Sequence, residues 1–178
     1  MYCLDSCPVY TDYVAAADDS QLSASSTHSD RHSVAQSRLN TLGYEANPAG
    51  SWSALTIAAG EWIQIDLLEP RHIDRIATQG RNDMTGPYHV QRVTSYKVSY
   101  SNDGSTFNYV LNFDGSERVF AGNTDSDTIV ANVFDAVQAR YIRLVVETWN
   151  SHASLRWGVF GCGNDYVYVP SQLIHVKY

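Results

Sequence analysis

The stretch from residue 61 to 67, Glu-Trp-Ile-Gln-Ile-Asp-Leu, decides the expected fold. Its residues Ile63, Ile65 and Leu67 alternate with Trp, Gln and Asp, and this two-residue period is that of an extended strand with one buried face. The alternation returns in residues 94–101, Thr-Ser-Tyr-Lys-Val-Ser-Tyr-Ser. A polar segment lies between the two stretches. The pattern therefore predicts strands of a half-buried sheet and an exposed polar loop.

Further strand patterns and turn signals continue along the chain. Asn102-Asp103-Gly104 is a hairpin signal, because this sequence favours the tight turns that join neighbouring strands. We expect one helical turn within residues 34–42, and no long helix is indicated. The other expected strands cover residues 21–26, 72–78, 92–101, 107–112, 129–134, 140–147 and 154–161. Short, evenly spaced strands predict an all-β fold, an antiparallel jelly roll or distorted β-barrel.

These strands and turns resemble the signature of a known family, the discoidin domain, also called the coagulation factor V/VIII type C domain. The resemblance covers roughly residues 7–162 and implies a discoidin-like, galactose-binding-domain-like fold. The matching segments are, in chain order, residues 24–26, 37–40, 61–67, 78–81, 94–98, 101–104, 122–124, 139–144, 148–150 and 155–162. One departure is Gly158, which stands where many members have Glu.

The resemblance also sets the expected domain boundaries. We expect a lead-in over residues 1–19, a discoidin-type domain over residues 20–162 and a tail over residues 163–178. At 178 residues the chain is long enough for one such domain with a sizeable core.

The cysteines are Cys3, Cys7 and Cys162. The family usually joins its ends by a disulfide, which implies the pair Cys7 and Cys162; closing so long a loop stabilises the fold by about 4–5 kcal/mol in the chain-entropy model. Such a bond indicates an oxidising compartment, so we expect a secreted or extracellular protein. Cys3 is left over: it is either a bridge to another chain or a free thiol. If the protein is a homo-oligomer, we expect its chains to be joined through Cys3 or the tail.

Composition and motifs argue against several classes of function. The formal net charge of -7 argues against nucleic acid, whose phosphates require a basic surface, and against membrane binding driven by charge alone. No run of apolar residues is as long as a membrane span. We find no Gly-x-Ser-x-Gly elbow, no His-Glu-x-x-His pair and no phosphate-binding glycine loop. We therefore expect a protein that is not an enzyme.

Two patterns suggest metal ligands, and each has a simpler interpretation. His28 and His32 are four residues apart but have no third ligand at a recognisable spacing, which favours solvent-facing loop residues. Asn123, Asp125 and Asp127 alternate like the start of a calcium loop, but the later positions of that motif are not matched, so a hairpin turn is the better interpretation. We expect no metal and no cofactor, although some relatives in the superfamily bind structural calcium, which stays open.

Other residues are assigned structural roles. Asp66 lies opposite the apolar face of its strand and needs a partner if it is buried, for which we name Arg75 or Arg143. The aromatic residues expected in the core are Trp62, Phe107, Phe134, Trp157 and Phe160.

The resemblance implies that three loops at one end of the sheet contact the ligand, with the turn before the last strand beside them. A rigid sheet that presents such loops is a common binding architecture. The predicted ligand-binding residues are His28, Asp30, Arg31, His32, Tyr44, Arg81, Asn82, Asp83, Tyr88, His89, Asn150, His152 and Arg156.

Two ligand classes divide the family. Blood-clotting and milk-fat-globule members insert apolar side chains into phosphatidylserine membranes, whereas discoidin lectins and bacterial galactose-binding modules bind sugars. The first loop is polar here, and Met84 and Tyr88 are the large apolar residues of the third. Polar groups beside an aromatic ring suit a sugar, which presents hydroxyls and an apolar face. We therefore expect a carbohydrate-binding cell-recognition or adhesion module for galactose- or N-acetylgalactosamine-type glycans of cell surfaces or matrix.

Two alternatives stay open. The first is a module that binds phosphatidylserine or other anionic phospholipid headgroups. The second is a protein- or matrix-binding adhesion domain. Peptide binding is disfavoured, because peptide-binding relatives carry an acidic residue for a bound arginine where this chain has Ile57.

Overall fold

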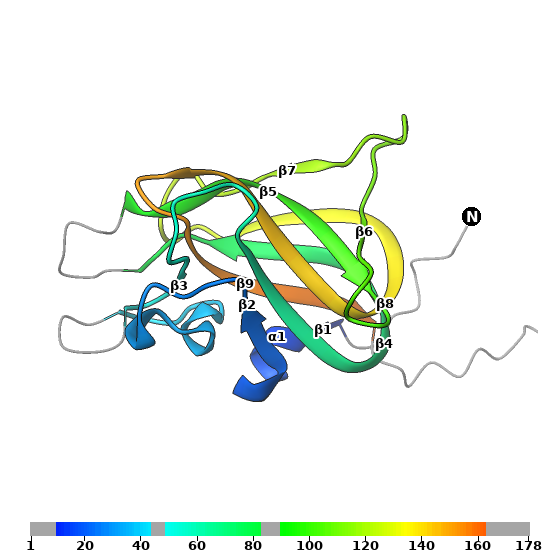
Figure 1. The fold of residues 1–178 in the computed structure, drawn as a ribbon, viewed down its shortest axis with the longest axis horizontal. Helices are drawn as coiled ribbons and strands as arrows, with labels where there is room; N and C mark the ends of the chain where they lie inside the picture. The colour runs from blue at the N-terminus through cyan, green and yellow to red at the C-terminus, as the bar shows by residue number, and fades with distance from the viewer. Residues whose placement is uncertain (1–9, 44–48, 83–89, 163–178) are drawn as a thin grey trace, which may run out of the picture.

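The computed structural model describes residues 10–43, 49–82 and 90–162, which form an antiparallel sheet with strand order β1-β9-β4-β8-β5-β6 (Figure 1). Strand β2 pairs with β4, β3 with β9 and β7 with β5. The strands are β1 (Tyr10–Asp12), β2 (Leu22–Ala24), β3 (Trp52–Ser53), β4 (Trp62–Gln79), β5 (Arg92–Ser101), β6 (Asn108–Tyr109), β7 (Val119–Ala121), β8 (Val130–Asn150) and β9 (Ser154–Cys162). The antiparallel all-β class is confirmed, and over the described residues the sheet stays open.

The helical segments are short. They are α1 (Tyr13–Ala16) and the 3₁₀ helices η2 (Asp19–Gln21), η3 (Asp30–His32) and η4 (Val34–Ser37). The single turn expected within residues 34–42 corresponds to η4.

Two long strands, β4 and β8, form the centre of the sheet. The sequence suggested two strands in each place, but each is continuous, and the pairing of β4 with β8 is interrupted between Asp66 and Arg71. Leu68 has a positive φ of 66° there, and Pro70 has no N–H for a ladder hydrogen bond. The first half of β4 pairs with β2 and the second half with β9. The irregularity therefore lets one strand serve both parts of the sheet.

The core follows the alternation seen in the sequence, with Ile63 and Ile65 fully buried. Of the aromatic residues assigned to the core, Trp157 and Phe134 are buried. Three others are only half-buried: Trp62, Phe107 and Phe160. The Arg143 guanidinium lies over the first two of these rings, 4.0 Å and 3.6 Å from their centroids, so they pack against a cation near the surface.

The partner of Asp66 differs from both residues named from the sequence. Arg140 donates from Nε and Nη2 to the two carboxylate oxygens of Asp66, at 2.7 Å and 2.8 Å. Asp66 pairs with Tyr141 across the strands, which places Arg140 one position away. Arg75 instead lies over the Tyr10 ring, and Arg143 bonds to Gln64.

Residues 10–16, which belong to the expected lead-in, pack against the last strand. Strand β1 pairs with β9 from Tyr10 opposite Cys162, and the Tyr13 hydroxyl donates to the Cys162 carbonyl oxygen at 2.9 Å. Asp12 caps α1 by accepting from the N–H groups of the next turn. Cys162 is disulfide-bonded. Its expected partner Cys7, together with Cys3 and the tail, lies outside the described residues, so that pairing stays a prediction.

Candidate functional site

The first loop is held at the start of β9 by the short strand β3. Ser53 of β3 pairs with Ser154 of β9. The Ser53 carbonyl oxygen accepts a hydrogen bond from the His28 N–H at 2.9 Å. The Ala54 N–H donates to the Ala153 carbonyl oxygen at 3.0 Å. These bonds place the first loop beside the turn that precedes β9, although the two segments are far apart in the sequence.

Three histidines, His28, His32 and His152, meet at this junction, and we call them the histidine cluster. The ring centroid of His28 lies 4.9 Å from that of His32 and 5.7 Å from that of His152, both in edge-to-face arrangement. His28 is exposed, whereas His32 and His152 are half-buried. The cluster is therefore accessible to a ligand from the side of His28.

Neighbouring serines orient two of these rings. The Ser29 hydroxyl oxygen lies 2.9 Å from His32 Nδ1, and the His32 N–H donates to the Ser29 carbonyl oxygen at 2.8 Å. The Ser154 hydroxyl oxygen lies 3.4 Å from His152 Nδ1. The serines therefore lie on the Nδ1 side of both rings.

Arg81, just after the end of β4, connects the bases of the loops beside the cluster. Its Nε donates to the Ala49 carbonyl oxygen at 3.1 Å, and its Nη1 donates to Gln91 Oε1 at 2.9 Å. The Ala49 N–H in turn donates to the Arg31 carbonyl oxygen at 3.0 Å. Arg81 therefore joins the first, second and third loops, and it is itself half-buried.

The electrostatic setting keeps the half-buried histidines neutral. Burial is the main factor that lowers the pKa of His32, to about 4, and the charges of Arg81, His28, Arg31 and His152 lower it further. Burial and the neighbouring His28 also lower the pKa of His152. At neutral pH these imidazoles can each both donate and accept a hydrogen bond, which suits hydroxyl groups.

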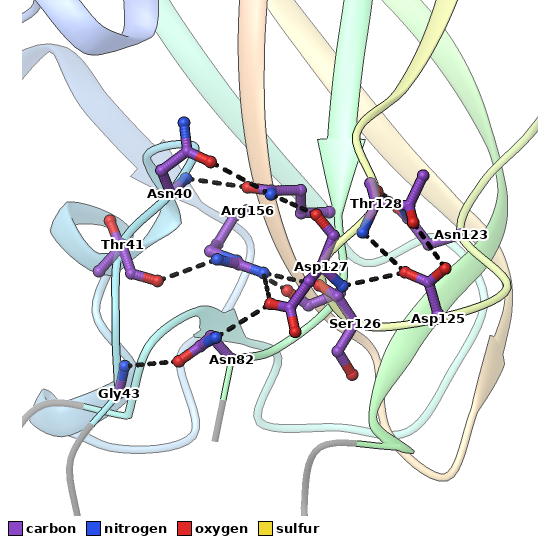
Figure 2. A network of polar contacts seen from close by, with 12 residues as sticks. Asn40, Thr41, Gly43, Asn82, Asn123, Asp125, Ser126, Asp127, Thr128 and Arg156 are labelled. Atoms are coloured by element: carbon purple, nitrogen blue, oxygen red, sulfur yellow. Dashed lines mark hydrogen bonds and ion pairs between the residues drawn. The ribbon is translucent and has the colours of Figure 1, made fainter. Parts of the chain in front are cut away.

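Arg156, predicted as a ligand contact, lies at the centre of a buried network (Figure 2). It is 1% exposed. Its Nε donates to the Gly80 carbonyl oxygen at 2.8 Å, Nη1 to that of Thr41 at 3.0 Å, and Nη2 to that of Ser126 at 2.6 Å. Nη2 also contacts Asp127 Oδ1 at 3.1 Å. This geometry gives Arg156 a structural role at the loop bases, and we leave it out of the ligand contacts proposed below.

Asn82 joins the same network. Its amide nitrogen donates to Asp127 Oδ1 at 2.9 Å, and its Oδ1 accepts from the Gly43 N–H at 3.1 Å (Figure 2). A Cβ atom at Gly43 or Gly50 would collide with the Asn82 backbone carbonyl oxygen, and Gly50 also has a positive φ of 69°. Asn82 therefore supports the ends of the second and third loops from inside, and we leave it too out of the proposed contacts.

The other predicted site residues are spread between exposed, half-buried and undescribed positions. Asp30 and Arg31 are exposed in η3, and Asn150 is half-buried at the end of β8. Four lie outside the described residues: Tyr44, Asp83, Tyr88 and His89. Gln91 was missed, although it binds Arg81 and lies 3.4 Å from the Ser154 hydroxyl. A lone glutamine after a polar loop gives no recognisable sequence signal.

The segment that resembles a calcium loop forms a turn held by Asp125. Its carboxylate accepts from the N–H groups of Asp127 and Thr128 and from the Thr128 hydroxyl. Over residues 10–43, 49–82 and 90–162, no group of three His, Cys, Asp or Glu side chains is arranged to hold a metal ion. The helices in the same residues include none long and apolar enough to span a membrane.

Comparison with known proteins agrees with this architecture. Mouse lactadherin (Mus musculus) is 37% identical over 147 residues, which cover 81% of this chain and 31% of lactadherin. Native recombinant discoidin II of Dictyostelium discoideum has a TM-score of 0.75 at 28% identity, over 87% of this chain and 60% of that one. A Clostridium perfringens module, CpGH89CBM32-5, solved in complex with GalNAc-β-1,3-galactose, has a TM-score of 0.54 at 20% identity, over 80% and 97% of the two chains.

The chain spans about a third of mouse lactadherin, so it corresponds to one part of that longer relative. Residues 21–159 match the model of the F5/8 type C domain. The chain therefore belongs to the F5/8 type C, or discoidin, domain family.

Proposed function

We propose that this domain is a non-catalytic carbohydrate-binding module of a secreted protein, which holds galactose- or N-acetylgalactosamine-type glycans at its loop end. The observation that carries the proposal is the meeting of the histidine cluster with Arg81 at one end of the sheet. Several polar groups converge there from separate loops, which is what recognition of a sugar's hydroxyls requires.

The chemistry of the cluster supports a sugar ligand. At neutral pH His32 and His152 are uncharged and present ring nitrogens beside the exposed His28. Tyr44 and Tyr88, which we proposed as stacking rings, lie outside the described residues. The Clostridium module, which has a similar fold, was solved with GalNAc-β-1,3-galactose bound, and this agrees with the proposed class of sugar.

The test is binding to a surface that carries galactosides at high density, since avidity from many copies offsets weak single-site affinity. His28→Ala removes an exposed side chain, while the His28 N–H bond to Ser53 needs only the backbone. We expect binding to fall by about tenfold or more, the loss of roughly one good hydrogen bond. His72→Ala is the matched control, because His72 is exposed and pairs with Cys162, at the opposite end of β9 from Ser154.

A second candidate, binding to phospholipid headgroups, is favoured by one observation. Leu42 and Val90, which border the undescribed parts of the second and third loops, are 45% and 37% exposed. Insertion of such side chains into a bilayer contributes roughly 1.5–3 kcal/mol each when burial is complete. The phospholipid candidate is favoured by three results together. The protein binds phosphatidylserine vesicles without calcium, the double substitution Leu42→Ser and Val90→Ser abolishes this binding, and no binding to the galactoside surface is seen. Binding to neither, with retention on a matrix protein, would favour an adhesion domain.

A further inference from the structure

The histidine cluster has cationic neighbours on a chain whose formal net charge is -7. His32 faces Arg31 and His28 from the first loop, Arg81 from the end of β4, and His152 from the turn before β9. His152 faces His28 and Arg81. The acidic residue of η3, Asp30, is exposed.

The cluster also lacks a counter-charge within the described part of the chain. None of its three imidazoles makes an ion pair with a carboxylate there. Elsewhere such pairs form: Asp66 binds Arg140, and Lys97 lies between two glutamates. Side chains that can all become positive are thus in ring-to-ring contact, and no carboxylate of the described residues neutralises them.

We propose that the histidine cluster is a proton-coupled subsite for an acidic substituent of the bound glycan, a sulfate or a carboxylate. The inference rests on the proposed glycan-binding function and adds to it the charge of the ligand. Protonated imidazoles form short, charge-assisted hydrogen bonds to such oxygens, and these are about twice as strong as neutral ones. A galactoside with such a group would place its hydroxyls on the neighbouring loops and its charge on the cluster.

Proton coupling follows from the electrostatics of the cluster. Burial and neighbouring cations keep the pKa of His32 low, at about 4. A bound anion acts in the opposite direction, because an opposite charge nearby favours the charged imidazole. Binding therefore takes up protons, and by reciprocity the affinity rises as the pH falls. Each proton taken up tightens Kd by up to about tenfold per pH unit.

The test is isothermal titration calorimetry of the whole chain with sulfated lactose, sialylated lactose and unmodified lactose. Titrations at about pH 7.5 and about pH 5.5 span the range in which a histidine in an anion site changes charge. Each is run in two buffers that differ in ionisation enthalpy, which gives the number of protons taken up. We expect an acidic lactose to bind about tenfold or more tightly at the lower pH with proton uptake, and lactose to show neither effect.

Substitutions assign the effect to the cluster. His32→Gln and His152→Gln keep a polar side chain that cannot become positive, so each should reduce the proton uptake and flatten the pH dependence for the acidic ligands. The matched control His72→Gln should leave both unchanged. Circular dichroism at each pH checks that every variant is folded.

The possible results separate the inference from the proposed function. If lactose binds as well as the acidic ligands at both pH values, without proton uptake, the inference is wrong and the proposed function stands. If no glycan binds at either pH, both are wrong. If the acidic ligands bind with proton uptake that His32→Gln and His152→Gln do not change, the charge lies elsewhere and the assignment to the cluster is wrong.

Discussion

Asp127 supplies the carboxylate that faces the guanidinium of Arg156, with 3.1 Å between Oδ1 and Nη2. The two differ greatly in exposure: the side chain of Arg156 is 1% exposed and that of Asp127 is 71% exposed. Burial lowers the pKa of Arg156, and the hydrogen bond and charge of Asp127 act against that shift. The buried cation is therefore stabilised by a partner that itself stays hydrated, so only one of the two charges carries a full desolvation cost.

Removal of Arg156 should cost far more stability than removal of the Asp127 charge. Arg156→Met leaves three carbonyl oxygens without their donor, in one buried and two partly buried bonds, at about 1 kcal/mol or more each, so we expect a loss of about 3 kcal/mol or more. Asp127→Asn keeps a hydrogen-bond acceptor and should cost about 1 kcal/mol. Urea unfolding of both variants measures the difference. Equal losses would show that the ion pair, and not the bonds to the backbone, stabilises the loop bases.

Gly50 should tolerate alanine much less well than Gly60, although both have positive φ. Gly50→Ala places Cβ against the Asn82 carbonyl oxygen, whereas nothing lies within 4 Å of a Cβ at Gly60. Gly60→Ala should cost only the strain of the left-handed conformation, about 1–2 kcal/mol. Gly50→Ala should cost more and also weaken ligand binding, because the loop ends must move apart. Thermal unfolding and galactoside binding test this, and similar values for the two variants would contradict it.

The free protein should lose stability as the pH falls from about 6.5 toward 4. His32 has its pKa lowered in the folded state, to about 4, so the folded state binds fewer protons than the unfolded state over that range. The contribution of His32 to the free energy of unfolding is complete above the unfolded pKa of about 6.5 and declines as the pH falls below that value. Melting temperatures measured across this range in wild type and in His32→Gln test the point. The variant should show a smaller decline, and parallel curves would exclude His32 as the source.

Arg140, and not Arg75, should control the ionisation of Asp66. The side-chain hydrogen bonds from Arg140 lower the pKa of Asp66. In Arg140→Gln that pKa should rise toward its ordinary value, about 3.9, whereas Arg75→Gln should leave it unchanged. NMR titration of the Asp66 carboxyl carbon measures this. A shift in the Arg75 variant alone would reverse the assignment.

The strands were predictable because their signal is local. The alternation of Ile63 and Ile65 follows directly from the pleat of a strand with one buried face. That residues 62–79 form one continuous strand was not predictable, because the sequence pattern indicates separate strands over residues 61–67 and 72–78, and only the pairing with β8 and β9 joins them.

The site was only partly predictable, because its geometry depends on contacts between distant segments. The three histidines were named from loop positions that the family resemblance implied, but their mutual contact depends on the pairing of β3 with β9. Arg156 is a charged residue near a loop, and such a residue is expected to be exposed. It is buried because the carbonyl oxygens of three separate segments converge on it, and no local pattern encodes that.

The bonds of Arg156 to Gly80, Thr41 and Ser126 all end on main-chain oxygens, which every residue type carries. Substitutions at Thr41 and Ser126 keep the acceptors as long as the backbone path is preserved, whereas a Cβ at Gly80 would lie 2.9 Å from the Asp125 carbonyl oxygen. Loop tips can then diversify during evolution while their anchoring persists. Such separation of support from recognition would allow related domains to exchange one ligand preference for another without redesigning their interior.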